Sequence, residues 1–306
     1  MRTETKVQNF VIFTKESVNN MEKGTLYLCA TPIGNLGDVS ARFLEVFNMV
    51  DFIAAEDTRQ TVKLLNFFDI KKPLISYHEH NKAEKGEYIC SLLEEGKNVA
   101  LVSDAGTPAI SDPGEDLVKL CIEKDLDVTS VPGPVALINA LILSGLSTKR
   151  FAFEGFLSVN KRHRNEHLKS VKYDTHTLIF YEAPHKLKYT LEDMLEILGD
   201  RKISIVRELT KLHEEVMRTT LGEAVKFYEE NKPRGEYVLV IEGAKEEAVS
   251  ENFWDDMTVC EHVEYYVNQG ERDKEAIKKV AADRNLPKRQ IYDIYHGIER
   301  KEEEQV

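Results

Sequence analysis

The chain has 306 residues, of which 42% are hydrophobic and 31% are charged. This length favours two domains of roughly 100 to 150 residues, and the lack of any apolar run near the ~20 residues of a membrane span argues against a membrane role. The net charge of −12 argues against nonspecific adhesion of the whole surface to polyanions, although it says little about local patches.

From Gly24 onward, short β-rich runs alternate with amphipathic segments of helical length. The segments between the runs carry apolar residues three and four positions apart, which indicates helices. Strand and helix in alternation predict a parallel sheet covered on both faces, which we assign to a first α/β domain at 24–145. The predicted strands are TLYLCAT (25–31), DFIAAED (51–57), PLISYHE (73–79), NVALVSD (98–104) and DVTSVPG (127–133).

After a Ser/Gly/Thr-rich stretch at 143–150, the pattern changes. Two of the following runs leave little room for a helix between them, so antiparallel neighbours and a mixed sheet are expected. We therefore predict a second α/β domain at 146–244. Its predicted strands are FAFEGFL (151–157), HTLIFYEA (176–183), KISIVREL (202–209), EVMRTT (215–220) and EYVLVIEG (236–243).

The two ends of the chain differ from these domains. Residues 1–20 show neither the apolar core of a signal peptide nor strong periodicity, so we expect an N-terminal extension at 1–23, with Met21 as an alternative start. Residues 250–306 follow a charged linker and are predicted to be helical. A turn at RNLP (284–287) between two of these helical segments weakly resembles a helix-turn-helix unit.

The cysteines and histidines do not indicate a metal or a disulfide. Cys29, Cys90, Cys121 and Cys260 lie far apart with no paired spacing, which is typical of reduced thiols in a cytoplasmic protein. The segment YHEH at 77–80 offers two histidines without a third ligand. We therefore predict a cytoplasmic protein without a bound metal.

The stretch VSDAGTPAISDPG at 102–114 extends past the end of the fourth predicted strand, where ligands bind in open parallel sheets. Glycine lets a ligand approach the main chain and proline fixes the loop, so we predict a rigid rim of backbone groups. Asp104 is a candidate acceptor for ribose hydroxyls or an ammonium, whereas Asp112 is equally compatible with capping the next helix. Similar turns, ATPIGNLGD (30–38) and VPGPVA (131–136), end the first and fifth strands.

A group of charged residues, Glu56, Asp57 and Arg59, ends the second predicted strand. Two interpretations stay open for this group. The residues form only a helix cap and an ion pair, or they form a cleft wall that orients a substrate hydroxyl or phosphate.

Two segments are rich in basic residues despite the acidic total: KRHRNEHLKSVK (161–172) and KEAIKKVAADRNLPKR (274–289). Charge alone favours solvated helix faces, and contacts with RNA phosphates are the alternative. The candidate RNA-binding residues are Lys161, Arg162, Arg164, Lys278, Lys279, Lys288 and Arg289.

Taken together and in this order, the motifs TPIGNLGD, AEDTR, LVSDAGTPAISDPG, VPGPVA, EGFL, IFYEAPHKL, RELTK and RGEYVLVIEG resemble the tetrapyrrole methylase superfamily. Within it, they are similar to the bacterial (cytidine-2'-O)-methyltransferases of small-subunit ribosomal RNA. The resemblance spans about residues 24–243. The chain departs from the family pattern at Ser158, where proline is usual, and at Lys186, where arginine is common.

The resemblance implies a two-domain α/β enzyme, commonly a homodimer, with S-adenosylmethionine bound in a cleft between the domains. The loop at 102–114 would hold this cofactor largely through its backbone. By motif position, the implied cofactor shell contains Pro32, Asp104, Gly106, Thr107, Ile110, Val135, Ala136, Tyr181, Ala183, Leu209, Thr210, Gly235, Glu236 and Tyr237.

The implied activity is 2'-O-methylation of a decoding-site cytidine in 16S ribosomal RNA, within the small ribosomal subunit. A ribose hydroxyl is a poor nucleophile at neutral pH, so we expect Glu56 or Asp57 to take or polarise its proton. Arg59 would steer the phosphodiester, and Glu208 and Lys211 would lie on the opposite wall. The alternatives are a tetrapyrrole C-methyltransferase and a noncatalytic RNA-binding or ribosome-assembly factor.

Overall fold

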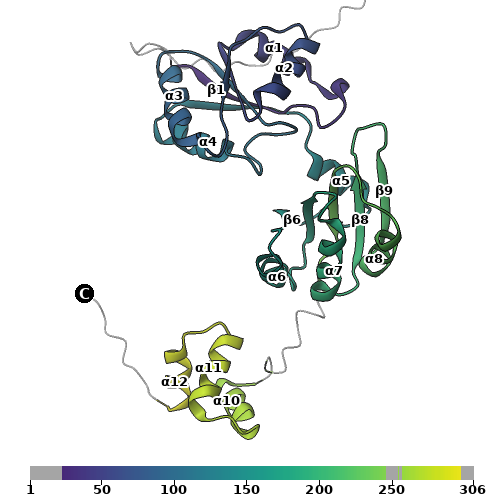
Figure 1. The fold of residues 1–306 in the computed structure, drawn as a ribbon. Helices are drawn as coiled ribbons and strands as arrows, with labels where there is room; N and C mark the ends of the chain where they lie inside the picture. The colour runs from purple at the N-terminus through teal and green to yellow at the C-terminus, as the bar shows by residue number, and fades with distance from the viewer. Residues whose placement is uncertain (1–22, 246–253, 255–256, 298–306) are drawn as a thin grey trace, which may run out of the picture.

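The computed structural model describes residues 23–245, 254 and 257–297 (Figure 1). Most of the predicted extension at 1–23, including Met21, lies outside the described residues, as do most of the charged linker and the chain after residue 297. In the described part of the chain, no helix is both long enough and apolar enough to cross a membrane.

The first lobe contains a five-stranded sheet in the order β3, β2, β4, β1, β5, and all of its pairings are parallel. This order confirms the predicted parallel sheet. Its elements are β1 (Thr25–Cys29), η1 (Leu36–Asp38), α1 (Ala41–Met49), β2 (Phe52–Ala55), α2 (Thr58–Phe67), β3 (Leu74–Ser76), α3 (Lys82–Glu94), β4 (Val99–Val102), α4 (Gly114–Glu123) and β5 (Asp127–Val131).

Helices cover both faces of this sheet, because apolar side chains leave the strands in both directions. Phe43 of α1 and Leu65 of α2 share one core cluster with strand residues. Ile89 of α3 and Leu117 of α4 share a second cluster. Figure 1 shows the two helix pairs on opposite sides of the strands, which leaves the ends of the strands for loops.

The second lobe contains a mixed sheet in the order β6, β7, β10, β8, β9, in which only the β6–β7 pairing is parallel. Helices α6, α7 and α8 share a core cluster with one face of this sheet. The mixed sheet confirms the prediction. Its elements are β6 (Phe151–Phe156), α6 (Lys161–Ser170), β7 (Thr177–Glu182), α7 (Leu187–Leu198), β8 (Lys202–Arg207), β9 (Glu215–Thr220), α8 (Leu221–Glu230) and β10 (Tyr237–Ile241).

Helix α5 (Ala136–Ser144) covers the other face of the second sheet. Its Leu137 and Leu141 pack with Val206 of β8 and Val240 of β10. The sequence pattern assigns this helix to the first domain at 24–145, and the packing corrects that assignment. We therefore propose a boundary before α5, in the turn at 131–134.

The C-terminal helices α10 (Val259–Asn268), α11 (Asp273–Asp283) and α12 (Lys288–Tyr295) form a small unit. Val263, Ile277 and Ile291, one from each helix, meet in a core of their own. Thr258 and Glu261 form a capping box that starts α10. The helical segment is thus confirmed, whereas its similarity to a helix-turn-helix unit stays a prediction.

Candidate active site

A cavity of about 520 Å³ lies where the loops of both lobes meet, beyond the carboxyl ends of the first sheet's strands. This volume is within the usual range of small-molecule sites. The first lobe and the start of α5 contribute Ile33, Glu56, Ser103, Asp104, Ala105, Gly106, Thr107, Ile110, Ser111, Asp112, Val135 and Ala136. The second sheet and its loops contribute Phe156, Tyr181, Glu182, Ala183, Pro184, Val206, Leu209, Glu236, Tyr237 and Val238.

The loop after β4 is closed by its own polar groups. The Asp112 carboxylate accepts hydrogen bonds from the backbone N–H groups of Ala109 (2.9 Å) and Gly114 (2.8 Å). Gly106, at φ 83°, exchanges two backbone hydrogen bonds with Thr31, which ties the loop to the end of β1. Asp112 therefore binds the first N–H of α4 and closes the loop before it, although the N-cap residue itself is Pro113, and Asp112 lines the cavity as well.

On the side of the first lobe, the carboxylates of Glu56, Asp104 and Asp112 line the cavity together. One carboxylate oxygen of Asp104 accepts a hydrogen bond from the backbone N–H of Asp57 at 2.9 Å, which joins the ends of β4 and β2. Burial, followed by the negative charges of Asp104 and Asp112, raises the pKa of Glu56. Glu56 is therefore a stronger base, once ionised, than an ordinary glutamate.

Asp57 and Arg59 do not line this cavity. The Asp57 carboxylate caps α2 by accepting from the backbone N–H of Arg59 (2.9 Å), and it pairs with the Arg59 guanidinium at 2.6 Å. These hydrogen bonds lower the pKa of Asp57 to about 2, so its carboxylate is a weak base. The interpretation as a helix cap and an ion pair fits both residues, and Glu56 is the stronger candidate for proton transfer.

Glu208 and Lys211 lie on the loop between β8 and β9, next to the cavity but outside its lining. The Lys211 ammonium contacts the carboxylates of Glu208 (3.0 Å) and Glu236 (2.8 Å). Although burial opposes it, hydrogen bonds from Lys211 and the Glu236 backbone N–H lower the pKa of Glu208. A Cβ on Gly34 would lie 2.4 Å from Lys211 Cγ, so the loop after β1 packs directly against this ion-pair cluster.

Most residues of the predicted cofactor shell line the cavity. Pro32, Thr210 and Gly235 do not, although each is followed or preceded by a lining residue. Their function, and that of the others, stays a prediction. The predicted residues in the lining are Asp104, Gly106, Thr107, Ile110, Val135, Ala136, Tyr181, Ala183, Leu209, Glu236 and Tyr237.

Sequence reasoning missed other lining residues. Ile33, Ser103, Ala105 and Ser111 flank predicted residues in the same loops, so loop membership was the available signal. Phe156 belongs to the EGFL motif. This motif lies at the end of a strand, where lining residues of a cavity are expected. Glu182, Pro184, Val206 and Val238 complete the missed set.

The predicted RNA-binding residues differ in exposure. Lys161 and Arg162 at the start of α6 are exposed, as are the four candidates in the C-terminal helices, Lys278, Lys279, Lys288 and Arg289. Arg164 is only 3% exposed, and its guanidinium pairs with Asp193 at 2.6 Å. The structure corrects the prediction for Arg164, because a buried, paired cation is not available to RNA.

The family model and the most similar relatives that were found agree on one family of proteins. The model for tetrapyrrole (corrin/porphyrin) methylases matches residues 25–225. A protein of Halalkalibacterium halodurans named ribosomal RNA small subunit methyltransferase I is 54% identical over 276 residues, which are 90% of this chain and 96% of that protein. Proteins of the same name from Bacillus subtilis and Thermotoga maritima are 50% and 48% identical, over 90% and 72% of this chain and 95% and 99% of their own lengths.

Solved structures support the fold. Diphthine synthase aligns with a TM-score of 0.56 at 14% identity, covering 72% of this chain and 89% of that chain. The methyltransferase CobJ aligns with a TM-score of 0.55 at 16% identity, covering 72% of this chain and 94% of that chain. At such low identity, the similarity concerns the fold alone.

Proposed function

The chain belongs to the tetrapyrrole (corrin/porphyrin) methylase family, and from this premise we propose that it methylates the ribose 2'-oxygen of a decoding-site cytidine in 16S ribosomal RNA. Relatives named as ribosomal RNA methyltransferases support RNA as the acceptor. The observation that carries the proposal is Glu56, a carboxylate with a raised pKa on the wall of a cavity of cofactor size.

S-adenosylmethionine is the methyl donor, and the residues of the cavity fit it. The carboxylates of Asp104 and Glu56 suit its cationic groups and hydroxyls, and the bare backbone at Gly106 allows close approach. Ile110 and Val135 offer apolar surface for its adenosine. When bound, the cofactor supplies an electrophilic methyl group on a sulfonium.

The chain's own contribution is positioning and proton transfer. Holding a ribose hydroxyl in line with the methyl group supplies much of the acceleration. Glu56 would accept the proton that the ribose hydroxyl loses when the oxygen takes the methyl group and the sulfonium leaves as a thioether, and it would then release this proton to solvent. A general base with a pKa raised toward neutrality accepts this proton more readily than an ordinary carboxylate.

Exposed cations away from the cavity suit RNA phosphates. Lys161 and Arg162 open α6, and Lys278, Lys288 and Arg289 lie on α11 and α12. Because the chain is acidic overall and basic only in local patches, its affinity for RNA should depend more on the three-dimensional shape of the target than on general attraction to phosphates. We therefore propose that the substrate is the assembled small subunit rather than free RNA.

The test is methyl transfer from labelled S-adenosylmethionine to three acceptors: small subunits lacking the modification, deproteinised 16S RNA and a tetrapyrrole precursor. We expect label on the 2'-oxygen of a cytidine, with the subunits as the best acceptor. Equal labelling of subunits and free RNA would contradict the assembled substrate. Label on the tetrapyrrole alone, or binding without transfer, would contradict RNA methylation.

Glu56→Gln tests the proposed base. We expect kcat to fall about 10²- to 10⁴-fold, because the amide cannot take a proton, while the cofactor Kd changes little. Glu94→Gln, an exposed acid on α3 outside the cavity, is the matched control. Near-normal kcat in Glu56→Gln would remove this residue from the mechanism.

A further inference from the structure

Phe156 is an aromatic ring at the mouth of the cavity. It lines the cavity and is nevertheless 55% exposed. A single exposed apolar residue on an open surface needs no explanation. This ring differs because it lies in the cavity wall and the surrounding residues hold it there.

One side of the Phe156 ring is already covered. The ammonium of Lys186 lies 5.6 Å from the ring centroid, and Lys186 itself is only 6% exposed. The ring of Tyr181 meets that of Phe156 edge-on, with centroids 5.5 Å apart and an angle of 60° between the planes. More than half of Phe156 nevertheless stays exposed, and the residue belongs to the cavity lining.

The backbone before Phe156 is shaped to present this ring. The pairing of β6 with β7 shifts register between Phe153 and Gly155, and Gly155 has φ 67°, in the region that favours glycine. Such a bulge bends an edge strand and redirects the side chain that follows it. Here the side chain that follows is Phe156.

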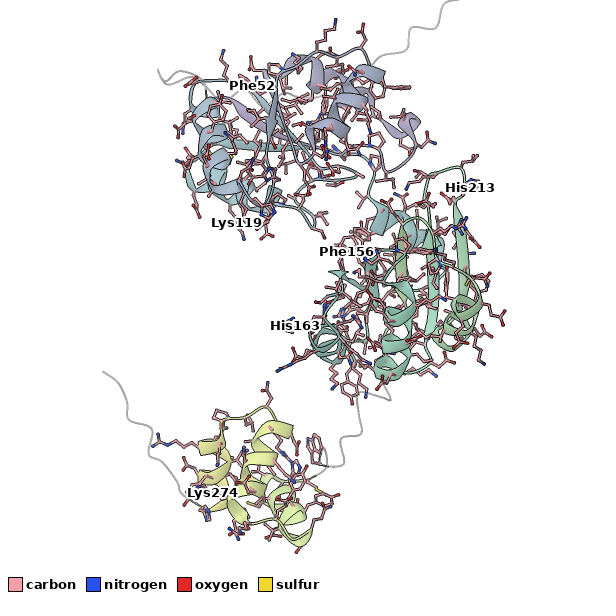
Figure 2. All side chains as sticks on the ribbon, viewed as in Figure 1. Phe52, Lys119, Phe156, His163, His213 and Lys274 are labelled. Carbon is pink, nitrogen blue, oxygen red and sulfur yellow. The ribbon has the colours of Figure 1, made fainter. Side chains whose placement is uncertain are left out.

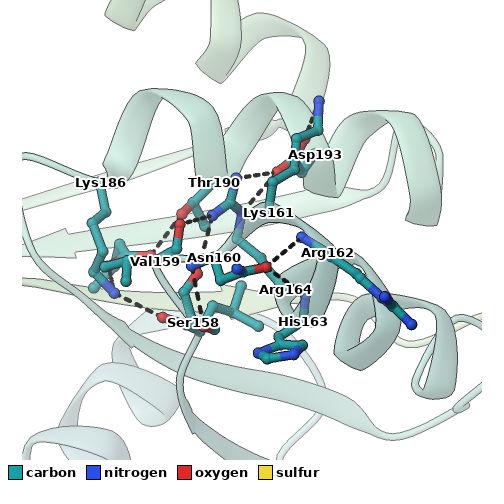
Figure 3. Close-up of polar contacts among 12 residues, drawn as sticks. Ser158, Val159, Asn160, Lys161, Arg162, His163, Arg164, Lys186, Thr190 and Asp193 are labelled. Carbon is teal, nitrogen blue, oxygen red and sulfur yellow. Dashed lines mark hydrogen bonds and ion pairs between the residues drawn. The ribbon is translucent and has the colours of Figure 1, made fainter.

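The backbone after Phe156 is held by two buried cations. Lys186 donates to the carbonyl of Leu157 at 2.9 Å. Arg164 donates to the carbonyls of Ser158 (3.0 Å) and Val159 (3.2 Å). Figure 3 shows both cations reaching into the same loop from α6 and from the turn before α7, so three successive carbonyls are fixed.

Both cations are neutralised below the surface. The Lys186 ammonium pairs with Glu182 at 2.7 Å, and Thr190 donates to the same carboxylate at 2.7 Å. The Arg164 guanidinium pairs with Asp193 at 2.6 Å. Buried ion pairs add little net stability, so stability alone does not explain two of them under one loop. Their clear effect is a single conformation of the backbone next to Phe156.

We propose that Phe156 is the stacking platform for the base of the acceptor nucleotide. This inference rests on the proposed function, because it specifies how an RNA acceptor enters the cavity. A nucleotide whose 2'-oxygen must reach a methyl group inside a cavity has to leave its stack, and a protein aromatic ring takes the place of the neighbouring bases. A ring in the cavity wall that is 55% exposed and held by its neighbours meets that need.

The residues that follow the loop are placed to contact the same RNA strand. Lys161 and Arg162 are exposed and stand at the start of α6, directly after the fixed carbonyls. In Figure 2, Phe156 and His163 of α6 lie along the same side of the second lobe. A strand whose base stacks on Phe156 can therefore place a flanking phosphate near these cations.

The test compares Phe156→Ala, Phe156→Leu and Phe156→Trp in methyl transfer to small subunits lacking the modification. We expect the Ala and Leu variants to raise KM for the subunit about tenfold or more, and Phe156→Trp to stay near the wild type, because any aromatic ring stacks. The cofactor Kd, measured by calorimetry, should be unchanged in all three. Phe151→Ala, at the other end of β6 and 40% exposed, is the matched control and should transfer normally.

Two outcomes would overturn the inference while the proposed function stands. If Phe156→Leu kept the wild-type KM, an apolar contact rather than aromatic stacking would be enough for the acceptor. If the cofactor Kd rose as much as KM, Phe156 would be a cofactor contact. A wild-type protein that methylates no RNA would instead remove the proposed function, and this inference with it.

Discussion

Ionisation of Glu56 lowers the stability of the folded chain, in addition to its proposed role as a base. Its pKa is raised above the ordinary value of 4.5 by burial and by Asp104 and Asp112. In the pH range just above 4.5, the folded chain therefore holds a proton at this site that the unfolded chain has released. Stability falls as the pH rises through that range, because the folded state must ionise an unfavourably placed carboxyl.

Glu56→Gln should therefore be more stable than the wild type at neutral pH and equally stable below the ordinary carboxyl pKa. The amide keeps the shape of the side chain and removes the ionisation. Urea unfolding of both proteins at several pH values between about 4 and 8 measures the difference, and Glu94→Gln controls for loss of a surface acid. A difference that does not depend on pH would contradict the assigned cause.

Arg164 and Arg162 differ in burial, so we expect their contributions to stability to differ. Arg164→Met should lower the free energy of unfolding by about 3–5 kcal/mol, because it leaves the buried Asp193 carboxylate without its main partner. Arg162→Met, two positions away on the same helix, removes an exposed pair with Glu166 and should cost less than ~1 kcal/mol. Chemical denaturation compares the two, and equal losses of stability would contradict this explanation.

At the level of elements, the sequence was sufficient where local pattern decides the structure. The apolar runs and the Gly/Pro turns after them predicted the strands of both sheets, because strand burial and turn chemistry are local properties. Helix α5 was assigned to the wrong lobe. It is apolar on most sides, so its pattern predicts that it packs on a sheet without showing which sheet.

A hydrogen bond fixes the start of α5 to the second sheet. The Tyr181 hydroxyl accepts from the backbone N–H of Leu137 at 3.1 Å. Tyr181→Phe should lower the free energy of unfolding by about 1 kcal/mol, because a helix-start N–H is left without its acceptor. Tyr88→Phe, on an exposed ring of α3, should have no measurable effect in the same thermal denaturation. Identical stabilities of the two variants would show that the bond is not formed in solution.

At the level of the whole molecule, the cavity could be predicted only through resemblance. Each lobe supplies part of the wall, and no local pattern states that two loops far apart in sequence will meet. Motif positions singled out Asp104 and Tyr181, which both line the cavity, and their role as cofactor contacts stays a prediction. The same reasoning could not tell Arg164 from Arg162, because a count of charges carries no information on burial.

The C-terminal unit is the part whose function rests on charge alone, and salt dependence tests it. Lys288→Ala combined with Arg289→Ala should weaken binding to the small subunit and flatten the plot of log K against log salt, by roughly 0.7–0.9 for each RNA phosphate that the protein no longer neutralises. Lys226→Ala combined with Lys232→Ala removes the same charge from exposed positions on or just after α8 and should leave that slope unchanged. The cofactor Kd should be the same in all of these proteins, because both pairs lie outside the cavity. If both double variants flatten the slope equally, net charge rather than the C-terminal helices determines RNA affinity.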